Sequence, residues 1–171
     1  MRLEKHLCLL GFMGSGKSTL GKMLAHRLGV SWVDTDQLVE AKQGESISDI
    51  VRLQGWDAFR AMEREVVLEI GSHVPMVISC GGGFPLDQQN WQWITKHCTS
   101  IFLKVDQEVL LDRLAVNASN RPLIQEKNYF ELTQFINEQL PKRALVYSKA
   151  DLTIVANGAP ERTLECIMQL I

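Results

Sequence analysis

A stretch near the N-terminus, GFMGSGKS beginning at Gly11, constrains the fold of this chain more than any other feature. Its spacing is G-x-x-x-x-G-K-[ST], in which backbone amides curl around the phosphates of a nucleotide. Gly11, Gly14 and Gly16 lack a Cβ, so the backbone can adopt the positive φ angles that such a loop needs. Lys17 adds a positive charge for the β- and γ-phosphates, and the Ser18 hydroxyl is suited to bind Mg²⁺. The stretch therefore predicts a nucleotide-binding loop.

The residues on either side of this loop have the patterns that it requires. The apolar run at 7–10 predicts a strand ahead of the loop. Apolar residues behind it recur at the spacing of a helix that packs on a sheet, namely Leu20, Met23, Leu24 and Leu28. A glycine-rich turn with an incidental lysine is therefore a poor alternative.

Strand and helix patterns alternate along the rest of the chain. The strand patterns fall at 7–10, 31–34, 75–79, 99–105 and 152–155. The helical patterns run from the loop to about 28 and then cover 37–41, 46–53, 59–70, 106–116, 131–140 and 160–171. Gly55 interrupts the third pattern, Gly71 ends the fourth, and Pro141 opens or kinks a continuation of the sixth. Because apolar strands separated by helices form parallel sheets covered on both faces, we expect an α/β fold with a three-layer, doubly wound, five-stranded parallel sheet.

The composition is that of one globular domain. Of the 171 residues, 46% are hydrophobic and 22% are charged, which suffices for a single core. We expect one domain over 1–171, with helices for a second substrate, the acceptor, at about 35–70. A mobile lid is expected at about 117–124, where Asn, Ser, Arg and Pro interrupt every periodic pattern. The formal net charge of −2 gives no reason to expect a nucleic-acid or membrane partner, and we expect a monomer.

The cysteines and the absence of targeting patterns bear on location. Cys8, Cys80, Cys98 and Cys166 show no C-x-x-C spacing, so we interpret them as buried, reduced thiols rather than disulfides or zinc ligands. No signal-peptide pattern precedes the first strand, and no apolar run approaches membrane-spanning length. We therefore expect a cytoplasmic protein.

Two carboxylates follow the second predicted strand, at Asp34 and Asp36. Ligands of open α/β sheets bind beyond the carboxyl ends of the strands, and strand alternation sends these two side chains to the same side. One can hold Mg²⁺ through water while the other accepts a proton from an attacking hydroxyl. The alternative is that one of them only caps the following helix.

Three consecutive glycines, Gly81 to Gly83, follow the third predicted strand. Such a run is entropically unfavourable, so we expect close approach of its amides to a ligand, the alternative being a tight connection with no ligand. Guanidinium groups bind planar carboxylates, and Arg60 and Arg143 are candidates, although each taken singly is typical of a solvated surface arginine. Arg121, in the expected lid, could swing onto ATP phosphates.

Taken in order, these motifs resemble the shikimate kinase family, whose members are P-loop kinases of a small molecule. The resemblance covers nearly the whole chain. It rests on GFMGSGKST, Asp34-Thr-Asp36, Phe59-Arg60 with Glu63, Gly81-Gly-Gly83, Arg121-Pro-Leu123, and Arg143 with Tyr147, Ala150 and Asp151. It implies a nucleoside-monophosphate-kinase-like fold and ATP-dependent phosphorylation of the 3-hydroxyl of shikimate, a step of aromatic amino acid biosynthesis, with Mg²⁺ as cofactor and ATP as co-substrate.

The resemblance also implies roles for individual residues. ATP would be bound by Gly14, Ser15, Gly16, Lys17, Ser18, Thr19, Arg113 and Arg121, with Arg113 and the segment after Val155 near adenine. Ser18 would ligate Mg²⁺, supported by Asp34 through water. Shikimate would be bound by Asp36, Arg60, Gly82 and Arg143, the two arginines gripping its carboxylate. The catalytic residues would be Lys17, Asp36 and Arg121.

Two other functions fit part of this pattern. Another small-molecule kinase, such as a gluconate kinase, would also have a phosphate loop and an aspartate for its acceptor hydroxyl. The paired arginines, the glycine triplet and the Arg-Pro lid favour shikimate. A nucleotide-binding regulator without turnover is disfavoured because every expected catalytic residue is intact.

Overall fold

Five parallel strands form the centre of the molecule, which a computed structural model describes for residues 3–71, 74–116, 123–124 and 127–171. They are β1 (His6–Leu10), β2 (Trp32–Asp34), β3 (Val77–Ser79), β4 (Cys98–Lys104) and β5 (Leu152–Val155). Their order in the sheet is β2-β3-β1-β4-β5, with every neighbouring pair parallel. All five residues of β1, the central strand, are buried. An uninterrupted apolar sequence at 7–10 therefore corresponds to a strand covered on both faces.

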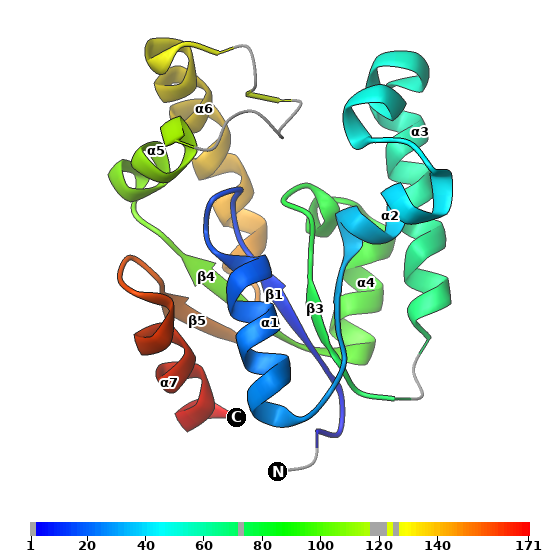
Figure 1. Ribbon diagram of the computed structural model, residues 1–171, viewed down its shortest axis with the longest axis vertical. Helices are drawn as coiled ribbons and strands as arrows, with labels where there is room; N and C mark the ends of the chain where they lie inside the picture. The colour runs from blue at the N-terminus through cyan, green and yellow to red at the C-terminus, as the bar shows by residue number, and fades with distance from the viewer. Residues whose placement is uncertain (1–2, 72–73, 117–122, 125–126) are drawn as a thin grey trace.

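Helices cover both faces of this sheet (Figure 1). The helix α1 (Lys17–Leu28) packs on β1 and β3 and lies beside α7 (Pro160–Leu170), while α4 (Gln88–His97) packs against β4 on the other face. Beyond the carboxyl ends of the strands, α2 (Thr35–Gln43) and α3 (Ile47–Ile70) rise on one side, and α5 (Gln107–Val116) and α6 (Tyr129–Tyr147) on the other. A short 3₁₀ helix, η1 (Phe84–Leu86), follows the glycine triplet. The expected three-layer, doubly wound fold is confirmed.

The helices α2 and α3 have a small hydrophobic cluster of their own. It consists of Val39, Ile50, Phe59 and Val66, and it is separate from the main core around the sheet. The side chain of Asp34 caps α2 by accepting a hydrogen bond from the Asp36 amide. The helix begins at Thr35, whereas the sequence predicted a start at residue 37. The cap alternative is thus correct for Asp34, and it places Asp36 in the first helical turn instead of on the strand.

One helix, α4, is missing from the sequence-based prediction. Asp87 caps it by accepting hydrogen bonds from the amides of Gln89 and Asn90. Trp91 and Trp93 pack against the main core from this helix. Asp87 and the spacing of the apolar residues were the available signals, but the helix is polar on the whole and short.

Two other helices contain the residues at which the sequence predicted a break or a kink. The helix α3 contains the expected interruption at Gly55, whose φ is 84° and ψ 172°. The helix α6 runs through Pro141 to Tyr147 as one element, and its start is fixed by a capping box between Asn128 and Glu131.

The cysteine interpretation holds for three of the four thiols. Cys8, Cys80 and Cys98 are buried and free, and the Sγ atoms of Cys8 and Cys80 lie 3.4 Å apart. Cys166 is exposed on α7, so the expectation that it is buried is wrong. Every helix in the described ranges is too short or too polar to cross a membrane.

Candidate active site

The loop after β1 adopts the conformation that its glycines predict. The φ angles of Gly11, Gly14 and Gly16 are 151°, 82° and 94°, which other residues rarely adopt. Gly16 is the N-cap of α1, so the loop leads directly into the N-terminus of that helix. Lys17, the first residue of α1, is buried, and its Nζ donates to the carbonyl oxygens of Gly11 and Phe12, both at 2.9 Å. Positive charge, a helix N-terminus and curled amides therefore converge at one point.

This loop forms one wall of a large cavity at the carboxyl edge of the sheet. The cavity has a volume of about 1020 Å³, which is room for more than one small molecule. All the expected site residues that the structure describes line it: Gly14, Ser15, Gly16, Lys17, Ser18, Thr19, Asp34, Asp36, Arg60, Gly82, Arg113 and Arg143. Arg121 lies outside the described residues, as does most of the expected lid.

Ser18 and Asp34 both line the cavity and are hydrogen-bonded to each other. The Ser18 hydroxyl donates to Oδ2 of Asp34 at 2.7 Å, while Oδ1 of the same carboxylate caps α2. The hydroxyl and the carboxylate lie next to the phosphate loop, and both are oxygen donors of the kind that Mg²⁺ prefers.

Asp36 faces the same cavity from the first turn of α2. Burial, followed by the nearby charge of Asp34, raises the pKa of Asp36 to about 6, whereas Lys17 and Arg60 act in the opposite direction. The two aspartates do reach one site, as expected. Alternation along the strand is not the reason, because Asp36 is helical.

The glycine triplet lies against these groups without unusual backbone angles. None of Gly81, Gly82 and Gly83 has a positive φ. The Gly81 amide donates to Oγ1 of the buried Thr35 at 2.8 Å. A Cβ added at Gly82 would lie 3.6 Å from the Met13 amide nitrogen, so the triplet packs directly against the phosphate loop. These glycines supply space rather than conformational freedom.

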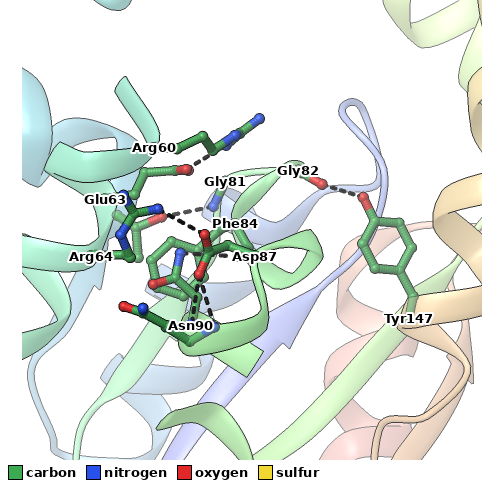
Figure 2. Close-up of polar contacts among 11 residues, drawn as sticks. Arg60, Glu63, Arg64, Gly81, Gly82, Phe84, Asp87, Asn90 and Tyr147 are labelled. Carbon is green, nitrogen blue, oxygen red and sulfur yellow. Dashed lines mark hydrogen bonds and ion pairs between the residues drawn. The ribbon is translucent and has the colours of Figure 1, made fainter. Parts of the chain in front are cut away.

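Arg60 approaches the triplet from α3. A Cβ at Gly83 would lie only 2.1 Å from its Nη2 atom, and its Nη1 pairs with the buried carboxylate of Glu63 (Figure 2). The guanidinium also lies over the rings of Trp56 and Phe59, 5.5 and 5.4 Å from their centroids. Burial raises the pKa of Glu63 to about 7, with the Arg60 charge opposing that shift. The Arg60 side chain is only 26% exposed and contacts Glu63 and the two aromatic rings. Arg60 is therefore not a solvated surface arginine, which is the alternative that the sequence left open.

Arg143 approaches the triplet from α6, on the other side. It is 8% exposed, lies over the Phe12 ring at 5.2 Å, and its Nη1 would be 3.4 Å from a Cβ at Gly82. Within the described part of the chain, its buried Nε has no hydrogen-bond partner. The surface interpretation is wrong for this arginine as well. Two guanidinium groups therefore flank the glycine triplet inside one cavity.

Arg113 connects the phosphate loop to the segment after β5. It donates to the carbonyl oxygens of Gly14, Ala156 and Asn157, at 3.3, 3.1 and 3.1 Å. Ala156, Gly158, Pro160 and Thr163 line the cavity beside it. The family resemblance implied that Arg113 and this segment lie in the same part of the site, and the structure brings them together.

Sequence reasoning assigned no role to several residues that shape the cavity. Thr35, Trp56 and Glu63 each contact a group named above, and Tyr147 contacts Gly82. Thr35, Glu63 and Tyr147 do stand within the motifs that carry the family resemblance, and Arg143 and Tyr147 are four positions apart on one helix.

A phosphate loop that faces carboxylates and paired arginines across one cavity is the arrangement of a P-loop small-molecule kinase. The shikimate kinase family model matches residues 13–171. The shikimate kinase of Rippkaea orientalis is 42% identical over 168 residues, which cover 97% of this chain and 87% of the relative. The chain belongs to the shikimate kinase family.

Solved structures agree with this assignment. Shikimate kinase from Bacteroides thetaiotaomicron superposes with a TM-score of 0.91 at 32% identity, covering 97% of both chains. Shikimate kinase from Acinetobacter baumannii in complex with shikimate has a TM-score of 0.90 at 32% identity, covering 97% of this chain and 92% of that one. A gluconokinase from Sinorhizobium meliloti has a TM-score of 0.59 at 17% identity over 99% and 95% of the two chains, which shows a shared fold alone.

Proposed function

We propose that the protein transfers the γ-phosphoryl group of ATP to the 3-hydroxyl of shikimate, giving shikimate 3-phosphate and ADP. The observation that carries this proposal is the single cavity in which the phosphate loop faces Asp36 and two arginines around the glycine triplet. A relative of 32% identity was solved in complex with shikimate, which supports the choice of acceptor.

On the nucleotide side, the loop from Gly14 to Thr19 binds the ATP phosphates. Its inward amides, the helix N-terminus and the buried Lys17 together neutralise the phosphoryl oxygens. Arg113 and the segment after β5 form the wall for adenine. Arg121, which lies outside the described residues, would add its charge to the transferring phosphoryl group when the lid at 117–124 covers it.

The residues beside the loop fit Mg²⁺. This ion prefers oxygen ligands and keeps several waters, so it needs few protein groups. Ser18 would ligate it directly and Asp34, 2.7 Å from that hydroxyl, would hold it through water. In the described ranges, His, Cys, Asp and Glu form no cluster of three that could hold a metal by themselves. When bound, Mg²⁺ would neutralise charge on the β- and γ-phosphates.

On the acceptor side, Arg60 and Arg143 bind the carboxylate of shikimate. Guanidinium groups donate two parallel hydrogen bonds to a carboxylate, and both arginines line the cavity. Gly82, between the two arginines, contacts a ring hydroxyl. Asp36 binds the 3-hydroxyl, orients its oxygen toward the γ-phosphorus and lies in position to accept its proton.

Catalysis in this arrangement comes chiefly from positioning and charge neutralisation. The transition state of phosphoryl transfer is loose, so little covalent assistance is needed. Asp36 aims the nucleophile, Lys17 and Arg121 stabilise the phosphoryl oxygens, and closure over the site excludes water, which limits hydrolysis of ATP. The phosphorus–oxygen bond to ADP breaks as the bond to the 3-hydroxyl oxygen forms, and the hydroxyl proton passes to the Asp36 carboxylate.

An ADP-release assay tests the proposal directly. Purified protein with ATP and Mg²⁺ is given shikimate, gluconate or no acceptor, and the phosphorylated product is identified by mass spectrometry. Release of ADP with shikimate and formation of shikimate 3-phosphate are expected. Turnover with gluconate alone would support the other kinase, and nucleotide binding without any turnover would support a regulator.

We also infer that the protein acts as a cytoplasmic monomer without nucleic-acid or membrane partners. The small formal net charge of −2 offers no extended field for a polyanion or an anionic lipid surface. Light scattering after size-exclusion chromatography tests the monomer, for which a mass near 19.3 kDa is expected.

A further inference from the structure

Tyr147 is the last residue of α6, and its side chain is fully buried although it carries a hydroxyl. Its ring packs against Phe102 of β4, with ring centroids 5.4 Å apart. A buried phenol needs a hydrogen-bond partner, and its Oη atom donates to the Gly82 carbonyl oxygen at 2.5 Å (Figure 2). The hydroxyl thus connects α6 to the middle of the glycine triplet.

The same hydroxyl also lies beside Arg143. The two residues are four apart on α6, so their side chains lie on one face of the helix. The positive charge of the Arg143 guanidinium is close enough to lower the pKa of the phenol, and its Nη1 would lie 3.4 Å from a Cβ at Gly82. One side chain therefore adjoins both groups that are assigned to the acceptor on this side of the cavity.

The phenol keeps its proton at physiological pH. Burial raises the pKa of Tyr147 to about 12, although the nearby charge of Arg143 acts in the opposite direction. A protonated hydroxyl can donate to the Gly82 carbonyl oxygen while its oxygen lone pairs attract the nearby guanidinium charge. The phenol is therefore suited to both of its neighbours.

The ends of the glycine triplet are held independently of Tyr147. The Gly81 amide donates to Thr35, and the Gly83 carbonyl oxygen accepts from the Leu86 amide at 3.0 Å. Losing the hydroxyl should therefore release the Gly82 peptide and the Arg143 side chain while leaving the rest of the loop in place.

We propose that Tyr147 is a positioning residue for the acceptor: its hydroxyl holds the Gly82 peptide and the Arg143 guanidinium in the mutual geometry that receives the carboxylate-bearing substrate. This inference rests on the proposed function. It assigns the tyrosine no contact with the substrate, only with the two groups that bind it. Loss of its hydroxyl should therefore weaken the binding of the acceptor and not the binding of ATP.

The variant Tyr147→Phe tests this role, because it removes one oxygen and keeps the ring. An unsatisfied buried carbonyl and a loosened guanidinium should raise the KM for shikimate roughly 5- to 20-fold. The KM for ATP should stay within about twofold, since the phosphate loop has its own contacts. The chain offers a matched control in Tyr129→Phe, which removes the same atom from an exposed tyrosine at the start of α6 and should change neither KM.

A second variant separates positioning from packing. Phe102→Leu weakens the contact with the Tyr147 ring but leaves the hydroxyl in place, so it should lower Tm without a selective rise in the shikimate KM. The stabilisation of each folded variant by shikimate and by ADP, measured as a shift in Tm, checks binding without turnover.

The outcomes distinguish the inference from the function on which it rests. The inference is overturned if Tyr147→Phe raises both KM values equally, if it lowers Tm with the shikimate KM unchanged, or if Phe102→Leu raises the shikimate KM as much. If the unmodified protein does not phosphorylate shikimate at all, the proposed function fails instead. A selective loss of shikimate affinity in Tyr147→Phe alone supports the inference.

Discussion

The Oδ1 atom of Asp36 lies so close to Gly81 that a Cβ on residue 81 would be 2.1 Å from it. Real Cβ atoms do not approach an oxygen so closely, so a side chain at this position and the observed place of Asp36 exclude each other. Asp36 comes from α2 and Gly81 from the end of β3, two elements that are far apart in the chain. The Asp36 carboxylate can occupy this position because Gly81, which lies against it, has no side chain.

Gly81→Ala should therefore impair catalysis by displacing Asp36. A shift of about 1 Å in a group that orients a nucleophile can reduce the rate roughly 100-fold, so a fall in kcat of about 10- to 100-fold is expected. Steady-state kinetics measure kcat, while the KM for ATP should be nearly unchanged. Gly44→Ala is the control: it strains a residue with φ of 70° in open space, and should cost stability but no activity. Unchanged kcat in Gly81→Ala would contradict the assigned place of Asp36.

Asp36→Asn should nearly abolish phosphorylation of shikimate. The amide is of similar size but cannot accept the proton or attract the hydroxyl as a carboxylate does, so a loss of at least about 100-fold in kcat is expected. ADP formation by a coupled assay gives the rate, and calorimetry should show retained ATP binding. The exposed Asp57→Asn on α3 is the matched control. Full shikimate turnover in Asp36→Asn would remove this residue from the mechanism.

Arg143→Gln should weaken binding of the acceptor far more than binding of the nucleotide. Each hydrogen-bonded contact between a guanidinium and a carboxylate contributes about 1.5–3 kcal/mol, so the KM for shikimate should rise about 10- to 100-fold. The KM for ATP should change little. Arg52→Gln removes an exposed arginine paired with Asp49 and should alter neither value. Equal effects of Arg143→Gln on the two substrates would count against its role.

The stability of the fold should depend on pH through Glu63. Burial raises its pKa to about 7 from an ordinary value of 4.5, with Asp36 and Asp87 adding to the rise and Arg60 opposing it. A raised carboxyl pKa means that the folded protein holds a proton that the unfolded chain has lost. The stability that this proton provides is fully present below pH 4.5 and is lost as the pH rises through 7, at about 1.4 kcal/mol per pH unit at most.

Glu63→Gln should flatten this decline. Free energies of unfolding in urea at pH 5 and pH 7.5 measure it, and the difference between the two values should be smaller in the variant than in the unmodified protein. Comparison of the two proteins cancels the contribution of the other carboxyl groups. Asp49→Asn, which removes an exposed carboxylate on the same helix, is the control. An identical decline in Glu63→Gln and the unmodified protein would show that Glu63 does not titrate in this range.

Much of the nucleotide half of the site could be predicted because its determinants are local. Gly11, Gly14 and Gly16 do have positive φ angles, and the apolar runs around them are the strand and helix that they indicate. Helix caps such as Ser46 and interruptions such as Gly55 were likewise readable, since each depends on contacts within a few residues. The α/β class follows from the same local periodicities.

For the acceptor half of the site, the sequence predicted which residues take part but not how the fold arranges them. The sequence alone did not reveal the strand order, the helix α4, the burial of Arg143 or the partial burial of Arg60, and the resemblance to a family was needed to group these residues. An arginine in a sequence carries no sign of the aromatic ring or carboxylate that a distant helix will place against it.

Two sets of glycines illustrate the difference between what the sequence alone predicts and what only the tertiary structure decides. Those of the phosphate loop are required by their own backbone angles, which neighbouring residues determine, so the sequence by itself was enough to predict a nucleotide-binding loop there. The glycines at 81 and 83 have ordinary angles and are required by Asp36 and Arg60, which α2 and α3 bring against them. Only the tertiary structure decided this second requirement, because a lack of space depends on which distant atoms occupy it.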